Sequence, residues 1–268
     1  MEITIDNKKY QANIDDTILE VCRKNNIYIP TLCEHVDLTP IGHCRICIVD
    51  VNGKIKTACN TKIEEKMTVI TSNETIDNHR KLLIELMIGN EPDILKSNPC
   101  KLLKIAKDLN VNTTRFEKRI EKLKANYNDI LEFDNNKCIN CGKCIQKCQI
   151  VQSVFAIDYE NRSCYTNITP YLKKKLQETV CTFCGQCSLS CPTGAIVEHD
   201  QTQEVINAIK DPKKHVIVQT APSIRASIGE TQGMPAGSHV TGKLVSALKK
   251  LGFDKILDTN FGADLTII

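Results

Sequence analysis

The alternation of apolar and polar residues predicts a small β-rich region at the start of the chain. MEITIDNKKYQANI reads as two strands around a polar turn at Asp6–Asn7. DDTILEVCRKNN follows, with an aspartate cap and apolar residues at helical spacing. ICIVDVNGKIKTA places Asn52–Gly53 between two apolar runs, which is a strong hairpin signal. We therefore expect residues 1–72 to form a β-grasp domain.

Helical spacing dominates the next region, residues 73–128. NHRKLLIELMIG and CKLLKIAKDLN both carry apolar residues at helical spacing, and the region lacks strand signals. Further along, the alternating charges of TTRFEKRIEKLKANY predict the solvated face of a helix. We expect a helical segment here.

Residues 129–200 contain an approximate internal repeat, and the composition changes again after it. CINCGKCIQKC begins at position 138 and CTFCGQCSLSC at position 181, and both read C-x2-C-G-x-C-x3-C. Within residues 201–268, QTQEVINAIK predicts a helix, KHVIVQTA a buried strand, VTGKLVSALKKLG a helix ending at Gly252, and FDKILDTN another strand. Strand–helix–strand is typical of the start of an α/β domain, here an incomplete one. The expected fold class is therefore α+β multidomain, with regions 1–72, 73–128, 129–200 and 201–268.

Composition and charge exclude several classes of protein. The 268 residues are 41% hydrophobic and carry a net charge of only +3, which does not indicate a nucleic-acid binder. MEITIDNKKY lacks the basic and apolar parts of a signal peptide, and no apolar run approaches the roughly 18 residues of a membrane span. We expect a cytoplasmic protein with no nucleic-acid partner and no membrane span. Cytosolic cysteines are mostly not disulfides, and the fifteen found here are an odd number.

The repeated cysteine runs favour iron–sulfur clusters over zinc or disulfides. Both match the two-cluster ferredoxin pattern C-x2-C-x2-C-x3-C-P, in which the fourth cysteine ligates the neighbouring cluster. One 4Fe–4S cluster is thus predicted on Cys138, Cys141, Cys144 and Cys191, and the other on Cys181, Cys184, Cys187 and Cys148. A tetrahedral zinc site would leave the additional cysteines unused. Pro192 ends the second run, whereas position 149 is glutamine, and Gly142 and Gly185 are expected to let backbone N–H groups approach cluster sulfurs.

A further set of cysteines predicts a 2Fe–2S cluster in the first region. Cys33, Cys44, Cys47 and Cys59 read C-x10-C-x2-C-x11-C, whereas the plant-type pattern is C-x4-C-x2-C…C. GHCRIC nevertheless lies on a loop directly before a strand of the predicted β-grasp domain. The alternative is that these are structural cysteines of a small domain. Cys22 is expected in a core, and Cys100 and Cys164 have no assigned role.

The order of these regions resembles the N-terminal half of FeFe-hydrogenases. Residues 1–200 also resemble the large iron–sulfur subunit of respiratory NADH dehydrogenase and NAD-linked formate dehydrogenases. The tail segments KHVIVQTAPSIRASIGE and GSHVTGKLVSALKKLGFDKILDTNFGADLTII are similar to the opening of the hydrogenase catalytic domain. The resemblance implies an electron-relay region of an enzyme that interconverts H2 with protons and electrons. It also implies a soluble partner, either ferredoxin or an NAD(P)-linked flavin subunit. The alternative is a non-catalytic electron carrier or subunit of an NAD-linked complex.

The resemblance also carries a cofactor-binding loop into this chain. In the family, an Ala-Pro-Ser loop after the first strand lies against the diiron part of the active-site H-cluster, and Ala221, Pro222 and Ser223 match it. The implied role is a backbone or hydroxyl donor toward a diatomic ligand. The alternative is that these residues only form the turn that ends the strand.

Two departures from the family pattern shape the expectations. The family usually has a 4Fe–4S cluster held by one histidine and three cysteines in the helical region, whereas NEPDILKSNPCKLL has Glu91 at the histidine position and only Cys100. His79 is too distant to rebuild the pattern, so we expect this cluster to be absent. The motifs that ligate the H-cluster do not occur in the 268 residues either. We therefore expect these residues not to be catalytic alone, and the H-cluster to belong to a full-length form.

Overall fold

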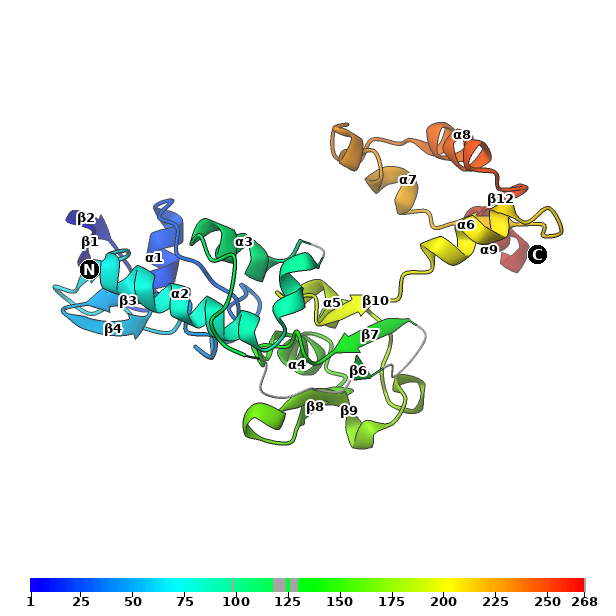
Figure 1. The fold of residues 1–268 in the computed structure, drawn as a ribbon. Coiled ribbons are helices and arrows are strands. Elements are labelled where there is room, and N and C mark those ends of the chain that lie inside the picture. Colours follow the sequence, from blue (N-terminus) through cyan, green and yellow to red (C-terminus); the bar gives the residue numbers. More distant parts are fainter. Residues whose placement is uncertain (98, 118–123, 126–129, 268) are drawn as a thin grey trace. The chain divides into compact units, whose positions relative to one another are not determined.

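The chain forms two compact units, Met1–His199 and Asp200–Ile268, in a computed structural model (Figure 1). The structure describes residues 1–97, 99–117, 124–125 and 130–267. Each unit is described by itself below.

The first unit begins with a mixed five-stranded sheet in the order β2-β1-β5-β3-β4. Its strands are β1 (Glu2–Ile5), β2 (Lys8–Gln11), β3 (Ile48–Val51), β4 (Lys54–Thr57) and β5 (Thr68–Ile70). Asp6 and Asn7 both have positive φ, as do Asn52 and Gly53, so each pair makes the tight turn that the sequence predicts. β1 and β2 pair antiparallel, as do β3 and β4, while β1 and β5 pair parallel.

Helix α1 (Ile18–Lys24) buries its apolar face, which includes Cys22, in the core of this sheet. The predicted aspartate cap is wrong, because Thr17 is the N-cap. Its Oγ1 accepts a hydrogen bond from the Glu20 backbone N–H at 3.2 Å, and the Glu20 carboxylate accepts one from the Thr17 N–H at 2.6 Å. Asp16 instead accepts from the Lys24 ammonium at 2.7 Å. The threonine closes a reciprocal capping box, which satisfies two helix-terminal donors.

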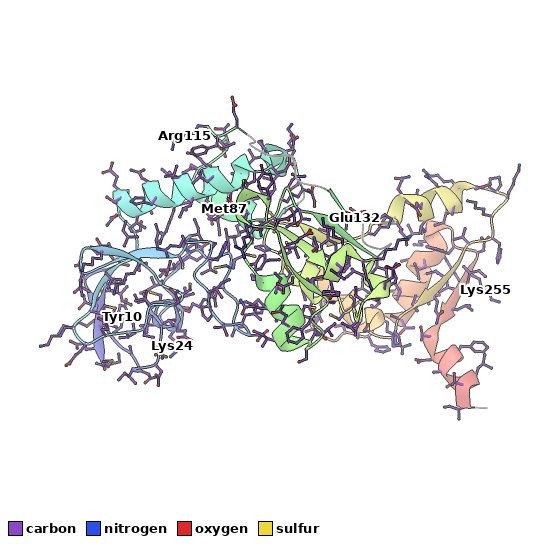
Figure 2. All side chains as sticks on the ribbon, turned by 90° about the horizontal axis from the view of Figure 1, so that it is seen from below. Tyr10, Lys24, Met87, Arg115, Glu132 and Lys255 are labelled. Carbon is purple, nitrogen blue, oxygen red and sulfur yellow. The ribbon has the colours of Figure 1, made fainter. Side chains whose placement is uncertain are left out.

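A helical segment follows the sheet, as the sequence predicts. It contains α2 (Glu74–Gly89), the 3₁₀ turn η1 (Pro92–Lys96) and α3 (Lys101–Asp108). A second apolar core lies among these helices, and Met87 of α2 packs at its border (Figure 2). Its buried aliphatic members from the segment are Ile84, Ile88, Ile94, Leu102, Ile105 and Val111.

The expectation of no strand within residues 73–128 is wrong at one point. Strand β6 (Lys124–Ala125) pairs antiparallel with β7 (Leu131–Asp134). Its two residues are too few to show a period-two pattern, so the sequence could not signal it. The predicted solvated helix of residues 113–127 lies largely outside the described residues, since 118–123 and 126–127 are among those not described.

The cysteine repeats lie in the last part of the first unit. A three-stranded sheet has the order β10-β7-β6, with β10 at Ile196–Glu198, and β8 (Ile157–Glu160) pairs antiparallel with β9 (Asn167–Pro170). The helices are α4 (Lys143–Gln146), the π-helical turn η2 (Lys147–Val151) and α5 (Gln186–Ser190). Short 3₁₀ turns are η3 (Ser163–Tyr165), η4 (Tyr171–Lys173) and η5 (Leu176–Glu178).

The two repeats end differently, and one residue accounts for the difference. After α5 the chain leaves the helix at Cys191, directly before Pro192. After α4 the helix continues through Cys148 and Gln149 as a π-helical turn. Proline disfavours helical backbone at the residue before it, whereas Gln149 does not. The missing proline therefore lengthens the first repeat by a helical turn.

The second unit has a strand–helix–strand order, as the sequence predicts. Its elements are α6 (Thr202–Lys210), β11 (Ile217–Thr220), α7 (Ile224–Ser227), η6 (Glu230–Gln232), α8 (Thr241–Leu251), β12 (Lys255–Asp258) and α9 (Thr259–Ile267). β11 and β12 pair parallel, and α8 ends at Gly252, whose φ of 104° gives the expected left-handed cap. The expectation that β11 is buried is wrong for this unit taken by itself, since Ile217 is 52% exposed. β11 pairs only with β12, and the side chains of β11 stay exposed or half-buried within the unit. A parallel strand is normally covered on both faces by further layers of the domain.

No helix among the described residues is long and apolar enough to cross a membrane.

Candidate metal centres

Loops around the first sheet bring Cys33, Cys44, Cys47 and Cys59 into one buried group. Cys33 follows α1, Cys44 and Cys47 precede β3, and Cys59 follows β4. The Cys44 N–H donates to the Cys33 Sγ at 3.5 Å. Gly42 has a φ of +63°, and a Cβ there would meet Asn60 Nδ2 at 2.7 Å, so the loop needs a glycine at this position.

The thiols of this group interact directly, and these interactions lower the pKa values of two of them and raise those of the other two. Side-chain hydrogen bonds with Cys44 and Cys59 lower the pKa of Cys33, and a bond with Cys59 lowers the pKa of Cys47. The same bonds raise the pKa values of Cys44 and Cys59, which keep the shared protons. Buried sulfur donors with no carboxylate in the group could hold either zinc or an iron–sulfur core. Iron would take the place of these protons, because metal binding deprotonates thiols.

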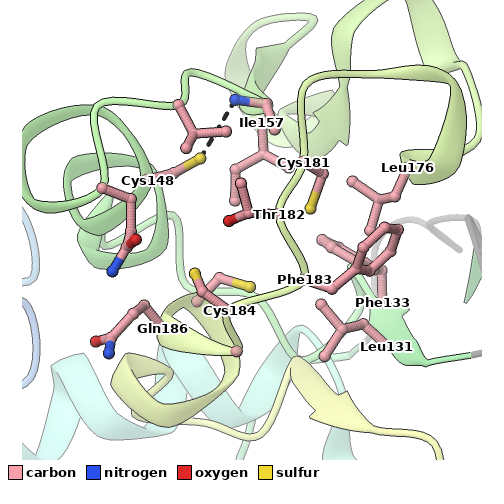
Figure 3. A pocket seen from close by; sticks show the side chains of 15 residues that line it. Leu131, Phe133, Cys148, Ile157, Leu176, Cys181, Thr182, Phe183, Cys184 and Gln186 are labelled. Carbon is pink, nitrogen blue, oxygen red and sulfur yellow. Dashed lines mark hydrogen bonds between the residues drawn. The ribbon is translucent and has the colours of Figure 1, made fainter. Parts of the chain in front are cut away.

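The eight cysteines of the repeats divide between two cavities. One cavity has a volume of about 20 Å³, and its cysteines are Cys138, Cys141, Cys144 and Cys191. The other has a volume of about 30 Å³, and its cysteines are Cys148, Cys181, Cys184 and Cys187 (Figure 3). Each cavity thus combines three cysteines of one repeat with the fourth of the other. The spacing predicts these same two sets as cluster ligands, and their role as ligands stays a prediction.

Apolar side chains form the rest of the cavity in Figure 3. Leu131, Phe133 and Leu176 lie on one side of it, and Ile157 and Phe183 also line it. Such a wall excludes water and lowers the local dielectric, and these are the means by which a protein tunes a bound redox centre.

Left-handed backbone at matching positions of the two repeats builds these loops. Asn140 and Phe183 both have a φ of 53°, and Gly142 and Gly185 have φ values of 74° and 72°. The turn at Asn140 directs its N–H to the Cys138 Sγ at 3.4 Å. Left-handed phenylalanine is uncommon, so the second loop holds Phe183 in a backbone conformation that its side chain alone does not favour.

Cys148, the fourth cysteine of the first repeat, also receives a backbone donor. The Ala156 N–H donates to the Cys148 Sγ at 3.2 Å, and Figure 3 marks this bond. Ala156 follows the π-helical turn η2, so the lengthened repeat brings the chain back over Cys148. Such a donor is oriented to stabilise the sulfur of a cluster ligand.

Burial alone works against ionised thiols at these sites. It raises the pKa values of Cys141 and Cys187 to about 12 and that of Cys144 well above its ordinary value. Bound iron would replace the protons of these thiols, because metal binding deprotonates its thiol ligands. The residues therefore fit a cationic core that supplies this charge.

No three cysteine, histidine, aspartate or glutamate side chains in the described ranges gather closely enough to hold a single metal ion. A multi-iron core binds its thiolates through separate irons, so its ligands need not converge on one point.

Two apolar cores of the first unit each contain or contact cysteines of more than one group. The second core contains Cys33 and Cys44 from the first group together with Cys141 from the repeats. A third core, which includes Leu131, Phe133 and Ile145, also contains Cys144, and cysteines from both cavities pack against it. Two buried lysines of α4 and η2, Lys143 and Lys147, accompany this region, and Lys147 donates to Asp37 at 2.7 Å. The sequence analysis missed both lysines, although their spacing of four residues places them on one helix face.

The remaining cysteines lie outside these groups. Cys22 is buried in the first core, as predicted, and burial raises its pKa to about 12. Cys164 is exposed. Cys100 is the N-cap of α3 and packs half-buried against the second core. Two residues later, the Leu102 N–H donates to the Pro192 carbonyl at 3.0 Å, so α3 is fixed to the loop after the second repeat.

The Ala221–Ser223 loop follows β11 and leads into α7. All three of its side chains are exposed in the second unit. The Ala221 carbonyl accepts from the Ile224 N–H at 3.2 Å, and Arg225 pairs with Asp258 at the end of β12 at 2.6 Å. The loop is thus held as a turn beside the carboxyl ends of two parallel strands, where α/β folds place ligands.

Comparison with known protein families matches three parts of the chain. Residues 1–74 match a 2Fe-2S iron-sulfur cluster binding domain, residues 175–197 a 4Fe-4S binding domain, and residues 214–268 the C-terminal domain of the iron only hydrogenase large subunit.

Curated relatives extend the similarity over the whole chain. The NADP-reducing hydrogenase subunit HndD of Solidesulfovibrio fructosivorans is 37% identical over 281 residues, covering 100% of this chain and 48% of that protein. Iron hydrogenase 1 of Clostridium pasteurianum is 37% identical over 277 residues, covering 99% of this chain and 48% of that protein. The NADPH-Fe(3+) oxidoreductase subunit alpha of Geobacter sulfurreducens is 31% identical and covers 74% of this chain and 24% of that protein. The chain spans about half the length of the first two relatives.

One solved structure shares the fold of much of the chain. A chain of an NAD+-reducing [NiFe]-hydrogenase in the H2-reduced state matches with a TM-score of 0.68 and 24% identity, covering 74% of this chain and 86% of that one. The mixed α/β fold with iron–sulfur domains is thereby confirmed. Together with the identity along the whole length, these matches show that the chain is similar to the N-terminal iron–sulfur half and the start of the catalytic domain of iron-only (FeFe) hydrogenases.

Proposed function

We propose that the chain holds one 2Fe–2S and two 4Fe–4S clusters and forms the electron-relay region of an FeFe-hydrogenase. The 2Fe–2S ligands are Cys33, Cys44, Cys47 and Cys59. The 4Fe–4S ligands are Cys138, Cys141, Cys144 and Cys191 for one cluster, and Cys181, Cys184, Cys187 and Cys148 for the other. The observation that carries this proposal is the crossed division of the repeat cysteines between two cavities.

The protein supplies the environment in which such clusters work. When bound, they would take up and release single electrons. The thiolates hold the irons, and backbone donors such as the Ala156 N–H stabilise the negative sulfurs. The apolar cores that contain the cysteine groups exclude water. Each bound cluster would therefore lie in surroundings with a low dielectric constant.

The longer enzyme would interconvert H2 with protons and electrons on an H-cluster beyond these residues. Ala221, Pro222 and Ser223 would border that cofactor, and their place at the end of β11 supports this role. The electron partner would be a ferredoxin or an NAD(P)-linked flavin subunit. Fifteen free thiols agree with a reducing, cytoplasmic compartment. The corresponding domains are 1–72, 73–128, 129–200 and 201–268.

A second candidate is a non-catalytic electron carrier or subunit of an NAD-linked complex. It is favoured by the 31% identity to an NADPH-Fe(3+) oxidoreductase subunit over 74% of this chain. The match of residues 214–268 to the hydrogenase family favours the first candidate. Co-expression with hydrogenase maturation factors separates them, because only a protein that also holds the H-cluster would gain H2-dependent dye reduction.

Iron and sulfide analysis tests the cluster assignment. The chain would be reconstituted anaerobically, and its iron and acid-labile sulfide counted. We expect about ten irons per chain. About fourteen would mean that residues 73–128 hold a further cubane, and about eight would remove the 2Fe–2S assignment.

A further inference from the structure

Helix α2 carries a charged side chain into the interior next to the first cysteine group. Arg80 is 5% exposed, although arginine is seldom buried without a full set of partners. Its position on α2 lies within the segment where relatives would carry an additional cluster, and nothing in the site described above uses it.

The contacts of Arg80 bind it to the strand that leaves the cysteine loop. Its Nη2 donates to the Ile48 carbonyl at 2.7 Å and to the Thr71 carbonyl at 3.0 Å. Ile48 directly follows Cys47. The guanidinium therefore lies against the backbone of the residue that follows a predicted 2Fe–2S ligand, and the charge of Cys47 acts on it.

The charge of Arg80 is only partly balanced by protein groups. Asp77 is the carboxylate beside it, with a distance of 3.6 Å between Nη1 and Oδ1, and this carboxylate is 37% exposed. The Arg80 Nε is buried and has no hydrogen-bond partner among the described residues. By contrast, Arg23, which also lies near Cys47, is held by both oxygens of Glu34.

Burying a cation without a close anion costs several kcal/mol, so the structure has to offset this cost elsewhere. Burial lowers the pKa of Arg80, while the negative charges of Asp77 and Cys47 oppose that shift. A 2Fe–2S core with four thiolates carries net negative charge, because thiolates and sulfides outweigh the ferric ions. It becomes more negative on reduction.

We propose that Arg80 is the buried counter-charge of the 2Fe–2S centre and raises its reduction potential. The inference rests on the proposed 2Fe–2S site. A fixed cation stabilises the reduced, more negative state more than the oxidised state, so it favours electron entry at this centre. The helical segment thereby acts on the redox properties of the neighbouring domain through a single side chain.

The test is a redox titration of the reconstituted chain, followed by the EPR signal of the reduced 2Fe–2S centre. Arg80→Met removes the charge and keeps the apolar stem. At a fixed ambient potential we expect at least a tenfold shift of the ratio of reduced to oxidised centre toward the oxidised form, which is about 59 mV for one electron. Arg80→Lys keeps the charge and should restore most of the potential. The matched control is Lys81→Met, since Lys81 is exposed on the same helix and its charge is screened by water.

A second variant keeps the test decisive if Arg80→Met does not assemble. Asp77→Asn removes the partial counter-charge and should shift the ratio in the opposite direction, toward the reduced form. A merely structural role for Arg80 would not produce shifts of opposite sign. An unchanged potential in Asp77→Asn, or an Arg80→Met shift no larger than that of Lys81→Met, would overturn the proposal. Absence of the 2Fe–2S signal from the wild-type chain would instead remove the proposed function on which it rests.

Discussion

The apolar core of the helical segment makes a prediction whose size follows from burial. Ile88 on α2 is 0% exposed and belongs to the core that also contains Cys33, Cys44 and Cys141. Ile88→Ala removes three buried carbons, worth about 0.8 kcal/mol each in transfer free energy. The remaining cavity adds a further term of about 24 cal/mol per Å³. We expect the free energy of unfolding to fall by about 3–4 kcal/mol.

Leu86 on the same helix provides the matched control, since it is 43% exposed. Leu86→Ala removes the same number of carbons from a side chain that already contacts water, so its cost should stay below about 1 kcal/mol. Urea unfolding of both variants, followed by far-UV circular dichroism, measures the difference, and the midpoint of Ile88→Ala should lie about 1–2 M below that of Leu86→Ala. Equal midpoints would refute the reasoning, because α2 would then not cover a packed core at Ile88.

Two further predictions concern the repeats. Cys148→Ala should lower the iron content by up to about four irons per chain and leave intact the EPR signal of the cubane that Cys191 would ligate. Loss of that signal instead would contradict the crossed grouping. Cys164→Ala, at an exposed cysteine, is the control. Gly142→Ala should destabilise the reconstituted chain more than Gly185→Ala, although both glycines have positive φ. A Cβ at position 142 would meet the Tyr159 hydroxyl at 2.8 Å, whereas a Cβ at position 185 would meet nothing nearer than Ser188 Oγ at 4.0 Å. Thermal unfolding measures the difference in stability between the two variants. Equal melting temperatures would contradict the prediction, because the Tyr159 side chain would then move aside without destabilising the fold.

Local signals in the sequence predicted much of the fold and of the candidate site. Asn52–Gly53 specifies its hairpin because both residues accept positive φ without long-range help. Cysteine spacing works in the same way, since a C-x2-C-x2-C loop fixes which sulfurs face one cavity. The spacing also predicts Cys148 as the crossed partner, because the fourth position of such a run lies beyond the loop, and Cys148 lines the cavity of the second repeat.

One local signal was missed, because Thr17 and Glu20 form a capping box one residue after the predicted aspartate cap. Features that depend on tertiary packing could not be predicted from the sequence. The burial of Arg80 depends on carbonyls of Ile48 and Thr71, which lie elsewhere in the chain. The exposure of β11 depends on which layers cover its sheet, and apolar periodicity does not report that.

Anomalous diffraction at the iron edge, on crystals of the anaerobically reconstituted chain, tests the central claim most directly. The account predicts three separate iron sites. One would lie among Cys33, Cys44, Cys47 and Cys59, and the other two in the cavities that combine Cys191 with the first repeat and Cys148 with the second. Iron density beside Cys100, or a site in which all four cysteines of one repeat bind the same core, would contradict it.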